Sequence, residues 1–145
     1  MKIFITGVAG FLGSHLADLM LSQGHKVAGN DNMIGGYSDN VPQDVEFHQI
    51  DCCDLENLTK AMKDCDIVYH TAATAYEGLS VFSPVLVTRN IFEASVTTIT
   101  AAIRNNVKRI VYCSSMARYG HHDEIPYKET YECRPQDPYG IAKVA

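Results

Sequence analysis

The sequence predicts an α/β fold, in which helices cover both faces of a doubly wound parallel β-sheet. Three observations support this prediction: an apolar run at the amino terminus leads directly into a glycine-spaced turn, apolar runs alternate with helical patterns along the chain, and polar residues stand where several runs end. Parallel strands need crossover connections, which are usually helices. We therefore expect a sheet with the strand order 3-2-1-4-5.

The first strand is expected at residues 2–6, and the helix after Gly10 should run to about Ser22. The turn between them has the spacing G-x-x-G-x-x-G, formed by Gly7, Gly10 and Gly13. Glycine at such a turn allows positive φ, close approach of backbone N–H groups to a phosphate, and tight packing of the helix on the strand. The turn therefore favours a pyrophosphate site at the positive end of the helix, although this spacing differs from the commonest dinucleotide-binding motif and on its own is a weak signal.

Further strands and helices complete the expected alternation. We expect strands at residues 26–30, 45–50, 66–70 and 109–113, a loop over 32–43, and helices after Asp54, over 84–106 and after Asp137. The segment 84–106 is the ambiguous one, because its many β-branched residues favour a strand by propensity. However, Ser83-Pro84 is a good helix start, small and apolar residues recur at helical spacing, and the sheet needs a crossover here, so a long helix is predicted.

The composition is that of an ordinary globular protein. The 145 residues fit one domain with a core, and the formal charge of −5 argues against a surface for nucleic acid or anionic membranes. No long apolar span is present and the first strand begins at residue 2, so we expect a soluble, cytoplasmic protein without a signal peptide. The five cysteines lack a metal-binding spacing, so we expect reduced thiols and no metal site.

An aspartate follows the second expected strand. Asp31 stands roughly 20 positions past the glycine turn, where the adenosine ribose of a dinucleotide is usually bound. A carboxylate at this place accepts hydrogen bonds from both ribose hydroxyls and repels a 2′-phosphate, which favours NAD over NADP. The alternative is an aspartate that only caps the turn over residues 31–36; the upstream glycines favour the ribose role.

A serine, a tyrosine and a lysine form a second candidate group. Ser115 lies at the end of the fifth expected strand, while Tyr139 and Lys143 stand one turn apart on the helix after Asp137. A free tyrosine ionises only near pH ~10, so its use as a base requires a stabilised phenolate, which an ammonium group one turn away would supply. By itself such a pair is often surface decoration, but together with Ser115, the glycine turn and Asp31 it favours a catalytic role.

The chain resembles a known family at positions along its whole length. The matching residues and motifs are Gly7-x-x-Gly10-x-x-Gly13, Asp31-Asn32, Asp51, His70-x-Ala72-Ala73, Asn90, Ser114-Ser115-x-x-x-Tyr119-Gly120 and Tyr139-x-x-x-Lys143. In this set and order the sequence is similar to the extended short-chain dehydrogenase/reductases, and most closely to the NAD-dependent nucleotide-sugar epimerase/dehydratase family, especially its UDP-glucose 4-epimerase-like members. The resemblance implies a Rossmann-like fold and NAD as the cofactor.

The resemblance also implies a role for each matching residue. The residues implied to bind the cofactor are, for its pyrophosphate, Gly7, Gly10, Gly13 and the backbone at Phe11 and Leu12; for its adenosine, Asp31, Asn32, Asp51 and Cys52; and along its length, Ala72, Ala73, Asn90, Tyr139 and Lys143. The implied catalytic residues are Ser115, which hydrogen-bonds the reacting sugar oxygen, Tyr139, which is the acid/base, and Lys143, which holds the nicotinamide ribose and stabilises the tyrosinate.

The implied reaction is epimerisation of a nucleotide-sugar, most often a UDP-sugar, at C4 through a transient 4-keto sugar. Dehydratases of the family carry an Asp-Glu pair just after the serine position; here Met116-Ala117 stands in that place, which argues against dehydration. The alternatives are a dehydratase or reductase of the same family and, from another class, a non-catalytic dinucleotide-binding module or sensor. The presence of Ser115, Tyr139 and Lys143 favours descent from an enzyme.

The resemblance bears on what this chain does alone, because family members continue well beyond the position of Lys143. They add further strands and a smaller substrate-binding domain, so residues 1–145 are expected to form an NAD-binding domain that is incomplete at its carboxyl end and lacks the substrate domain. We expect this chain alone to bind cofactor poorly to moderately and not to turn over. An apolar stripe on the helix over 84–105 should be exposed, and in the family helices at this position often build a homodimer interface.

Overall fold

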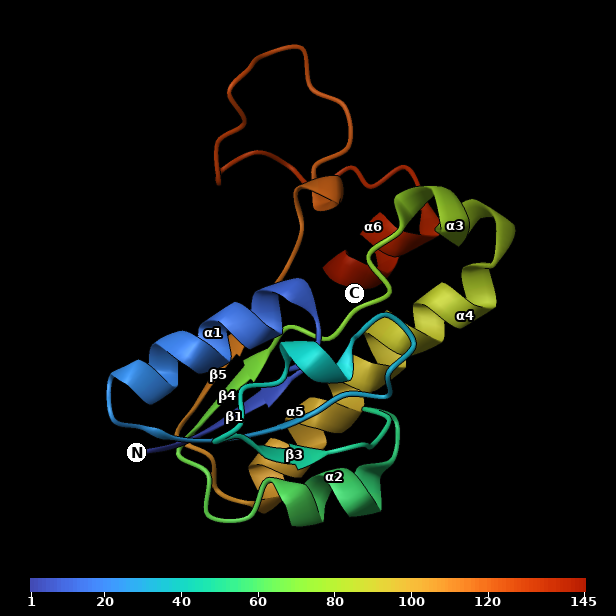
Figure 1. Ribbon diagram of the computed structural model, residues 1–145. Helices are drawn as coiled ribbons and strands as arrows, with labels where there is room; N and C mark the ends of the chain where they lie inside the picture. Colours follow the sequence, from blue (N-terminus) through green and yellow to red (C-terminus); the bar gives the residue numbers. More distant parts are fainter.

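The computed structural model describes residues 1–145 and contains one five-stranded parallel sheet (Figure 1). The strands lie in the order β3-β2-β1-β4-β5, which confirms the predicted order and the Rossmann-like fold. Every neighbouring pair is parallel. The strand bounds are β1 Lys2–Thr6, β2 Lys26–Asn30, β3 Glu46–His48, β4 Ile67–His70 and β5 Arg109–Tyr112.

Helices connect β1 to β2, β3 to β4 and β4 to β5, whereas the connection from β2 to β3 contains only a short 3-10 turn. The helix bounds are α1 Phe11–Ser22, α2 Leu55–Ala61, α3 Glu77–Phe82, α4 Pro84–Thr88, the π-helical turn η2 Arg89–Glu93, α5 Ala94–Arg104 and α6 Pro138–Val144, with short 3-10 turns η1 Ser38–Asn40 and η3 Met116–Arg118. The long helix expected over 84–106 is confirmed, with the π turn between α4 and α5 as an addition. The helix α3 was not predicted. No helix combines the length and the apolar composition that a membrane crossing would need.

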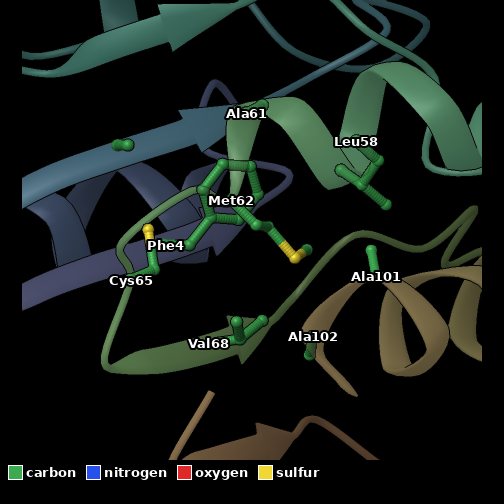
Figure 2. Packing of buried hydrophobic residues seen from close by; sticks show 9 residues of the cluster. Phe4, Leu58, Ala61, Met62, Cys65, Val68, Ala101 and Ala102 are labelled. Atoms are coloured by element: carbon green, nitrogen blue, oxygen red, sulfur yellow. The ribbon is translucent and has the colours of Figure 1, made fainter. Parts of the chain in front are cut away.

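Alternate residues of β1 pack against opposite layers of helices. Ile3 and Ile5 face the layer of α1, in a cluster with Val8, Ala17, Val27 and Val45. Phe4 faces the layer of α2 and α5, where Figure 2 shows it among Leu58, Ala61, Met62, Cys65, Val68, Ala101 and Ala102. Because side chains alternate along a strand, a strand buried on both faces needs a continuous apolar run, as β1 has. Truncation of Phe4 to alanine should cost about 3–5 kcal/mol of stability.

Two aspartates begin helices as the sequence predicts. The Asp54 carboxylate accepts a hydrogen bond from the amide of Asn57, at 3.2 Å, at the start of α2. The Asp137 carboxylate accepts one from the amide of Gly140, at 2.8 Å, and Pro138 occupies the first position of α6. Side-chain caps of this kind contribute about 1 kcal/mol each, so these two residues set where α2 and α6 begin.

The helix α6 has seven residues and would be marginal in isolation. Its Tyr139 and Ala142 form a buried cluster with Val87 of α4 and Ile91 of η2. Figure 1 shows α6 lying beside α3 and α4. Packing against α4 and η2 therefore fixes the helix that carries Tyr139.

Apolar side chains are exposed along α4, η2 and α5, as expected from the sequence. This surface, called the exposed helix stripe below, consists of Val85, Leu86, Phe92, Val96, Ile99 and Ile103. Residues at positions 92, 96, 99 and 103 follow one another at helical spacing, so they share one side of the helix. Exposed apolar surface of this kind is typical of interaction sites.

Candidate functional site

A cavity of about 480 Å³ opens at the carboxyl ends of the strands. It brings together segments that follow β1, β2, β3, β4 and β5, together with η2 and α6. The predicted site residues in its lining are Gly7, Gly10, Phe11, Leu12, Gly13, Asp31, Asn32, Asp51, Cys52, Ala72, Ala73, Asn90, Tyr139 and Lys143. Open α/β sheets bind their ligands at the carboxyl ends of the strands, beside the point where the strand order reverses, which here lies between β1 and β4.

Ser115 is the one predicted site residue that does not line the cavity. It is half-buried and begins η3, where its hydroxyl accepts a hydrogen bond from the amide of Ala117 at 3.2 Å. Its neighbour Ser114 lines the cavity instead. The structure therefore gives Ser115 a local capping role and leaves its predicted contact with a substrate untested.

The glycine turn requires glycine at two positions. Gly7 has a φ of +70°, and a Cβ added to it would lie 2.8 Å from the Cα of Ala72. A Cβ on Gly13 would overlap the carbonyl oxygen of Gly7. Gly10 caps α1 without a side chain, and the first turn of α1 holds no acidic residue, so nothing from the chain covers this helix end. The free amides and the helix dipole there fit a phosphate group.

Asp31 is buried at the end of β2, beside this turn. Its carboxylate accepts hydrogen bonds from the amide of Ala9, at 3.2 Å, and from the amide of Met33, at 2.8 Å. The capping role considered in the sequence analysis is therefore present. The carboxylate also lines the cavity, so Asp31 joins the glycine turn to the loop after β2 and offers its remaining acceptor sites to a ligand.

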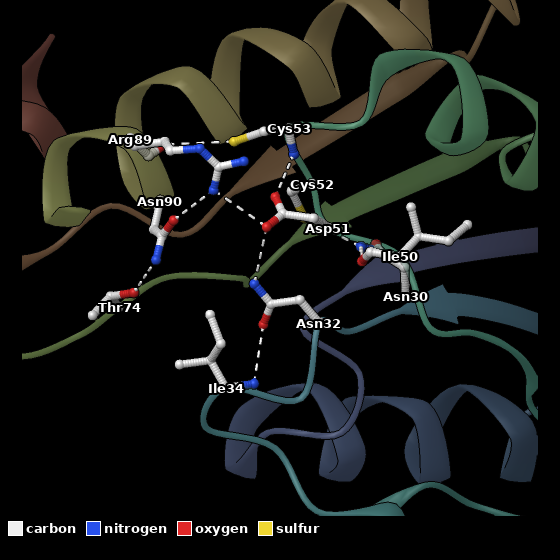
Figure 3. A network of polar contacts seen from close by, with 10 residues as sticks. All are labelled: Asn30, Asn32, Ile34, Ile50, Asp51, Cys52, Cys53, Thr74, Arg89 and Asn90. Atoms are coloured by element: carbon white, nitrogen blue, oxygen red, sulfur yellow. Dashed lines mark hydrogen bonds and ion pairs between the residues drawn. The ribbon is translucent and has the colours of Figure 1, made fainter. Parts of the chain in front are cut away.

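Asp51 is the centre of a polar network at the same end of the cavity (Figure 3). Its Oδ1 accepts a hydrogen bond from the amide of Cys53 at 2.8 Å, and its Oδ2 accepts from Asn32 Nδ2 at 3.3 Å and from Arg89 Nη1 at 3.2 Å. Burial would raise the pKa of Asp51, but these hydrogen bonds outweigh burial and lower it, so the carboxylate is ionised. Arg89 was not predicted, because an exposed helical arginine has no distinguishing sequence signal.

Asn90 and Cys52 complete this end of the cavity. Asn90 donates from Nδ2 to the hydroxyl of Thr74 at 2.9 Å, and its Oδ1 accepts from Arg89 at 3.2 Å. Cys52 is buried, and its sulfur accepts a hydrogen bond from the side-chain amide of Asn30 at 3.3 Å. Burial raises the pKa of Cys52 to about 11, so this residue remains a neutral thiol.

Lys143 and Tyr139 meet at the other end of the cavity. The ammonium group of Lys143 donates to the carbonyl oxygen of Cys113 at 2.7 Å and lies 5.1 Å from the ring centroid of Tyr112. It lies 5.9 Å from the ring centroid of Tyr139. Lys143 is only 7% exposed, and this burial lowers its pKa. A cation is thus held beside a cavity-lining phenol, as the spacing of the two residues predicts.

A buried histidine supports the floor of the cavity. His70 Nδ1 lies 2.7 Å from the hydroxyl of Thr6, and its Nε2 lies 3.0 Å from the hydroxyl of Ser95. Because the Ser95 hydroxyl donates to the carbonyl of Ile91, it accepts from Nε2–H, and Nδ1 accepts from Thr6. The Thr6 hydroxyl in turn accepts from the amide of Ala72 at 3.1 Å. Burial lowers the pKa of His70 to about 4, so the imidazole is neutral.

The five cysteines are free, and no group of three or more His, Cys, Asp or Glu side chains is arranged to hold a metal ion. The polar groups of the cavity are therefore organised as hydrogen-bonding side chains, backbone amides and one buried ammonium group. Such a set suits a long ligand that combines a phosphate region with hydroxyl and amino groups.

The chain is similar to known proteins in both sequence and structure. A UDP-glucose 4-epimerase from Streptococcus mutans is 33% identical over 148 residues, which cover 99% of this chain and 44% of the relative. The solved UDP-glucose 4-epimerase of Thermotoga maritima with UDP-glucose superposes with a TM-score of 0.95 at 30% identity, covering 99% of this chain and 48% of the other. The UDP-glucose 4-epimerase of Thermus thermophilus in complex with NAD gives a TM-score of 0.94 at 34% identity, covering 99% and 47%.

The chain thus spans less than half the length of the relatives that it matches. The family model for the NAD dependent epimerase/dehydratase family matches residues 3–145, which is nearly all of it. The chain therefore belongs to the NAD dependent epimerase/dehydratase family.

Proposed function

We propose that this chain is the cofactor-binding part of an NAD-dependent nucleotide-sugar 4-epimerase. The observation that carries the proposal is the convergence of the glycine turn, Asp31, Asp51, Tyr139 and Lys143 on one cavity. The relatives named UDP-glucose 4-epimerase support the reaction, and the relative solved with NAD supports the cofactor.

The residues present fit NAD. The open amino-terminal end of α1 would hold the pyrophosphate, because its amides lack partners and no side chain fills the space beside Gly10. Asp31 would accept hydrogen bonds from the adenosine ribose, and Asp51 from a donor group of the adenine. Bound NAD⁺ would supply the hydride acceptor for oxidation of the sugar.

Tyr139 would remove the proton of the sugar 4-hydroxyl and return it after the 4-keto sugar has turned over. Lys143 stabilises negative charge on that phenol, because its ammonium group is held 5.9 Å from the ring centroid by the carbonyl of Cys113. Ser115 would need to turn its hydroxyl away from the amide of Ala117 to hydrogen-bond the sugar oxygen. We propose that substrate selection lies mostly in the smaller domain that the resemblance implies.

The exposed helix stripe is the proposed homodimer interface of the full-length protein, which would take a UDP-sugar as substrate. Six large apolar residues along one helical rod are a surface that association would bury. The formal charge of −5 argues against an interaction with nucleic acid or an anionic membrane, so none is proposed.

Calorimetric titration of the chain with NAD⁺ and with NADP⁺ tests the proposal. We expect NAD⁺ to bind more tightly than NADP⁺, and Asp31→Asn to remove most of that preference, because the carboxylate that repels a 2′-phosphate is lost. Asp39→Asn is the matched control, since Asp39 is an exposed acid on η1 outside the cavity. Binding of neither dinucleotide, or an unchanged preference in Asp31→Asn, would contradict the proposal.

A second candidate function is a non-catalytic dinucleotide-binding module, which is favoured by the position of Ser115 outside the cavity lining. An assay of the protein encoded by the longest reading frame that contains this chain separates the two functions. The protein is mixed with NAD⁺ and UDP-galactose. Formation of UDP-glucose supports the epimerase, and tight NAD⁺ binding without turnover supports the module.

A further inference from the structure

Arg89 holds two cavity-lining side chains without lining the cavity itself. Its Nη1 donates to Asp51 Oδ2 and to Asn90 Oδ1, each at 3.2 Å (Figure 3). Its carbonyl oxygen also accepts a hydrogen bond from the thiol of Cys53 at 3.7 Å. One residue of η2 therefore fixes the segment after β3 through both its side chain and its backbone.

The network continues to the loops after β2 and β4. Asn32 donates to Asp51, and Asn90 donates to Thr74, so the guanidinium group of Arg89 sits between two chains of hydrogen bonds. Figure 3 shows these residues in one continuous network. Loss of Arg89 would leave Asp51 and Asn90 each with one partner fewer and would disconnect the two loops.

The hydrogen bonds leave Asp51 with one free acceptor position. An ionised carboxylate offers about four such positions, two on each oxygen. Asn32 and Arg89 occupy both positions on Oδ2, and the Cys53 amide occupies one of the two on Oδ1. The remaining position, on Oδ1, accepts hydrogen bonds only, so it suits an amino group and disfavours a carbonyl group.

We propose that Arg89 is a positioning residue that sets the purine preference of the cofactor site, by holding Asp51 so that it selects an amino-bearing base over a keto-bearing one. This inference rests on the proposed binding of NAD. Without Arg89, Oδ2 regains a free position and the carboxylate can rotate, so it no longer presents one fixed acceptor. Discrimination between adenine and hypoxanthine then weakens together with affinity.

The two dinucleotides NAD⁺ and nicotinamide hypoxanthine dinucleotide test this inference, because NAD⁺ carries an amino group at C6 of the purine, whereas the hypoxanthine analogue carries a keto group there together with a proton on N1. We expect the wild-type chain to prefer NAD⁺ by about ten-fold or more in Kd, as hydrogen bonds to charged groups allow. Arg89→Met should weaken NAD⁺ binding by about ten-fold and reduce the preference to about two-fold. Arg89→Lys, which keeps the charge but loses the planar fork, should fall between them.

Arg104→Met is the matched control. Arg104 lies at the end of α5 and pairs with Glu56 of α2 at 3.0 Å. Its side chain is about as exposed as that of Arg89, and it does not line the cavity. Its replacement should change neither Kd, and thermal unfolding should verify that both arginine variants are folded.

A double-mutant cycle with Asp51→Asn identifies the route of the effect. If Arg89 acts through Asp51, Arg89→Met should change the Kd of NAD⁺ less than about two-fold in the Asp51→Asn background. An equal loss of affinity for both dinucleotides, or an undiminished effect in that background, would assign Arg89 a purely structural role and overturn the inference. Failure of the wild-type chain to bind either dinucleotide would refute the proposed function and this inference with it.

Discussion

The ammonium group of Lys143 lies 2.7 Å from the carbonyl oxygen of Cys113, so the last helix is tied to the end of β5. This contact is a charge-assisted hydrogen bond inside the molecule, since Lys143 is buried. It holds the cation 5.1 Å from the ring centroid of Tyr112 and 5.9 Å from that of Tyr139. The same lysine thus anchors α6 and supplies positive charge to the candidate active site.

Replacement of Lys143 by methionine should loosen α6. The variant keeps most of the length of the side chain but leaves the Cys113 carbonyl without its donor, which should cost about 1.5–3 kcal/mol locally. Hydrogen exchange measured by mass spectrometry should show faster exchange in peptides that cover α6. The exposed Lys128 provides the control, and Lys128→Met should leave the exchange of α6 unchanged. Equal exchange in wild type and Lys143→Met would contradict an anchoring role.

The stability of the chain should fall as the pH is lowered, in part because of His70. Burial lowers the pKa of His70 to about 4 from an ordinary value of 6.5. Between these values the unfolded chain binds a proton that the folded chain excludes, so His70 makes the free energy of unfolding fall by about 1.4 kcal/mol per pH unit. The free energy of unfolding is therefore unaffected by His70 above pH 6.5 and is progressively lowered by it as the pH falls from 6.5 toward 4.

Urea titrations between about pH 7 and pH 5 measure this dependence. Carboxylates contribute to the acid sensitivity as well, so the informative quantity is the difference between wild type and His70→Gln. We expect a shallower dependence in His70→Gln and an unchanged one in His121→Gln, whose imidazole is exposed. A slope shared by all three proteins would show that His70 titrates alike in the folded and unfolded chains.

Gly13→Ala should destabilise the glycine turn. The added methyl group overlaps the carbonyl oxygen of Gly7, which is backbone and cannot rotate away, so a loss of about 1–3 kcal/mol is expected. NAD⁺ binding should be lost as well, because the turn must shift. Gly78→Ala is the control: its Cβ meets nothing within 4 Å, and alanine in this helix should stabilise the chain by up to about 1 kcal/mol. Tolerance of Gly13→Ala in both thermal unfolding and titration would refute the tight packing described for the turn.

Self-association should depend on the exposed helix stripe. The chain is expected to dimerise at micromolar concentrations, and Val96→Lys with Ile99→Lys should weaken association at least about ten-fold, because two charges would need to be desolvated. Ile125→Lys changes another exposed apolar residue, in the loop before α6, and should have no effect. Sedimentation velocity distinguishes the outcomes; a monomeric wild-type chain would exclude the stripe as a dimer interface.

The sheet order could be predicted because strand patterns alternate with helical patterns along the chain, and because crossovers between parallel strands are usually helices. The helix α3 could not be predicted. Its six residues begin after Tyr76 without a side-chain cap, and its position depends on packing against α4 and α6, which no local pattern records.

The site could be predicted where a residue type is demanded by the backbone or by chemistry. The steric requirements at Gly7 and Gly13 left a visible glycine spacing, and the i,i+4 relation brought Tyr139 and Lys143 to one cavity. Arg89 escaped prediction because its importance lies in its contact with Asp51, a residue distant in the sequence. The hydroxyl of Ser115 turns toward a local amide, which strand-end position alone does not reveal.

The π turn at Arg89–Glu93 changes which side of the continuous helix formed by α4 and α5 faces the rest of the molecule. A π turn adds one residue without adding a turn, and each residue of an α-helix advances by about 100°, so α5 is rotated by about that angle relative to an uninterrupted continuation of α4. In this way α4 can present Val87 to Tyr139 while α5 presents Ala101 to the sheet. Deletion of one residue from the π turn would preserve the number of turns but rotate the two contacts out of alignment, so in this segment chain length itself is under structural constraint.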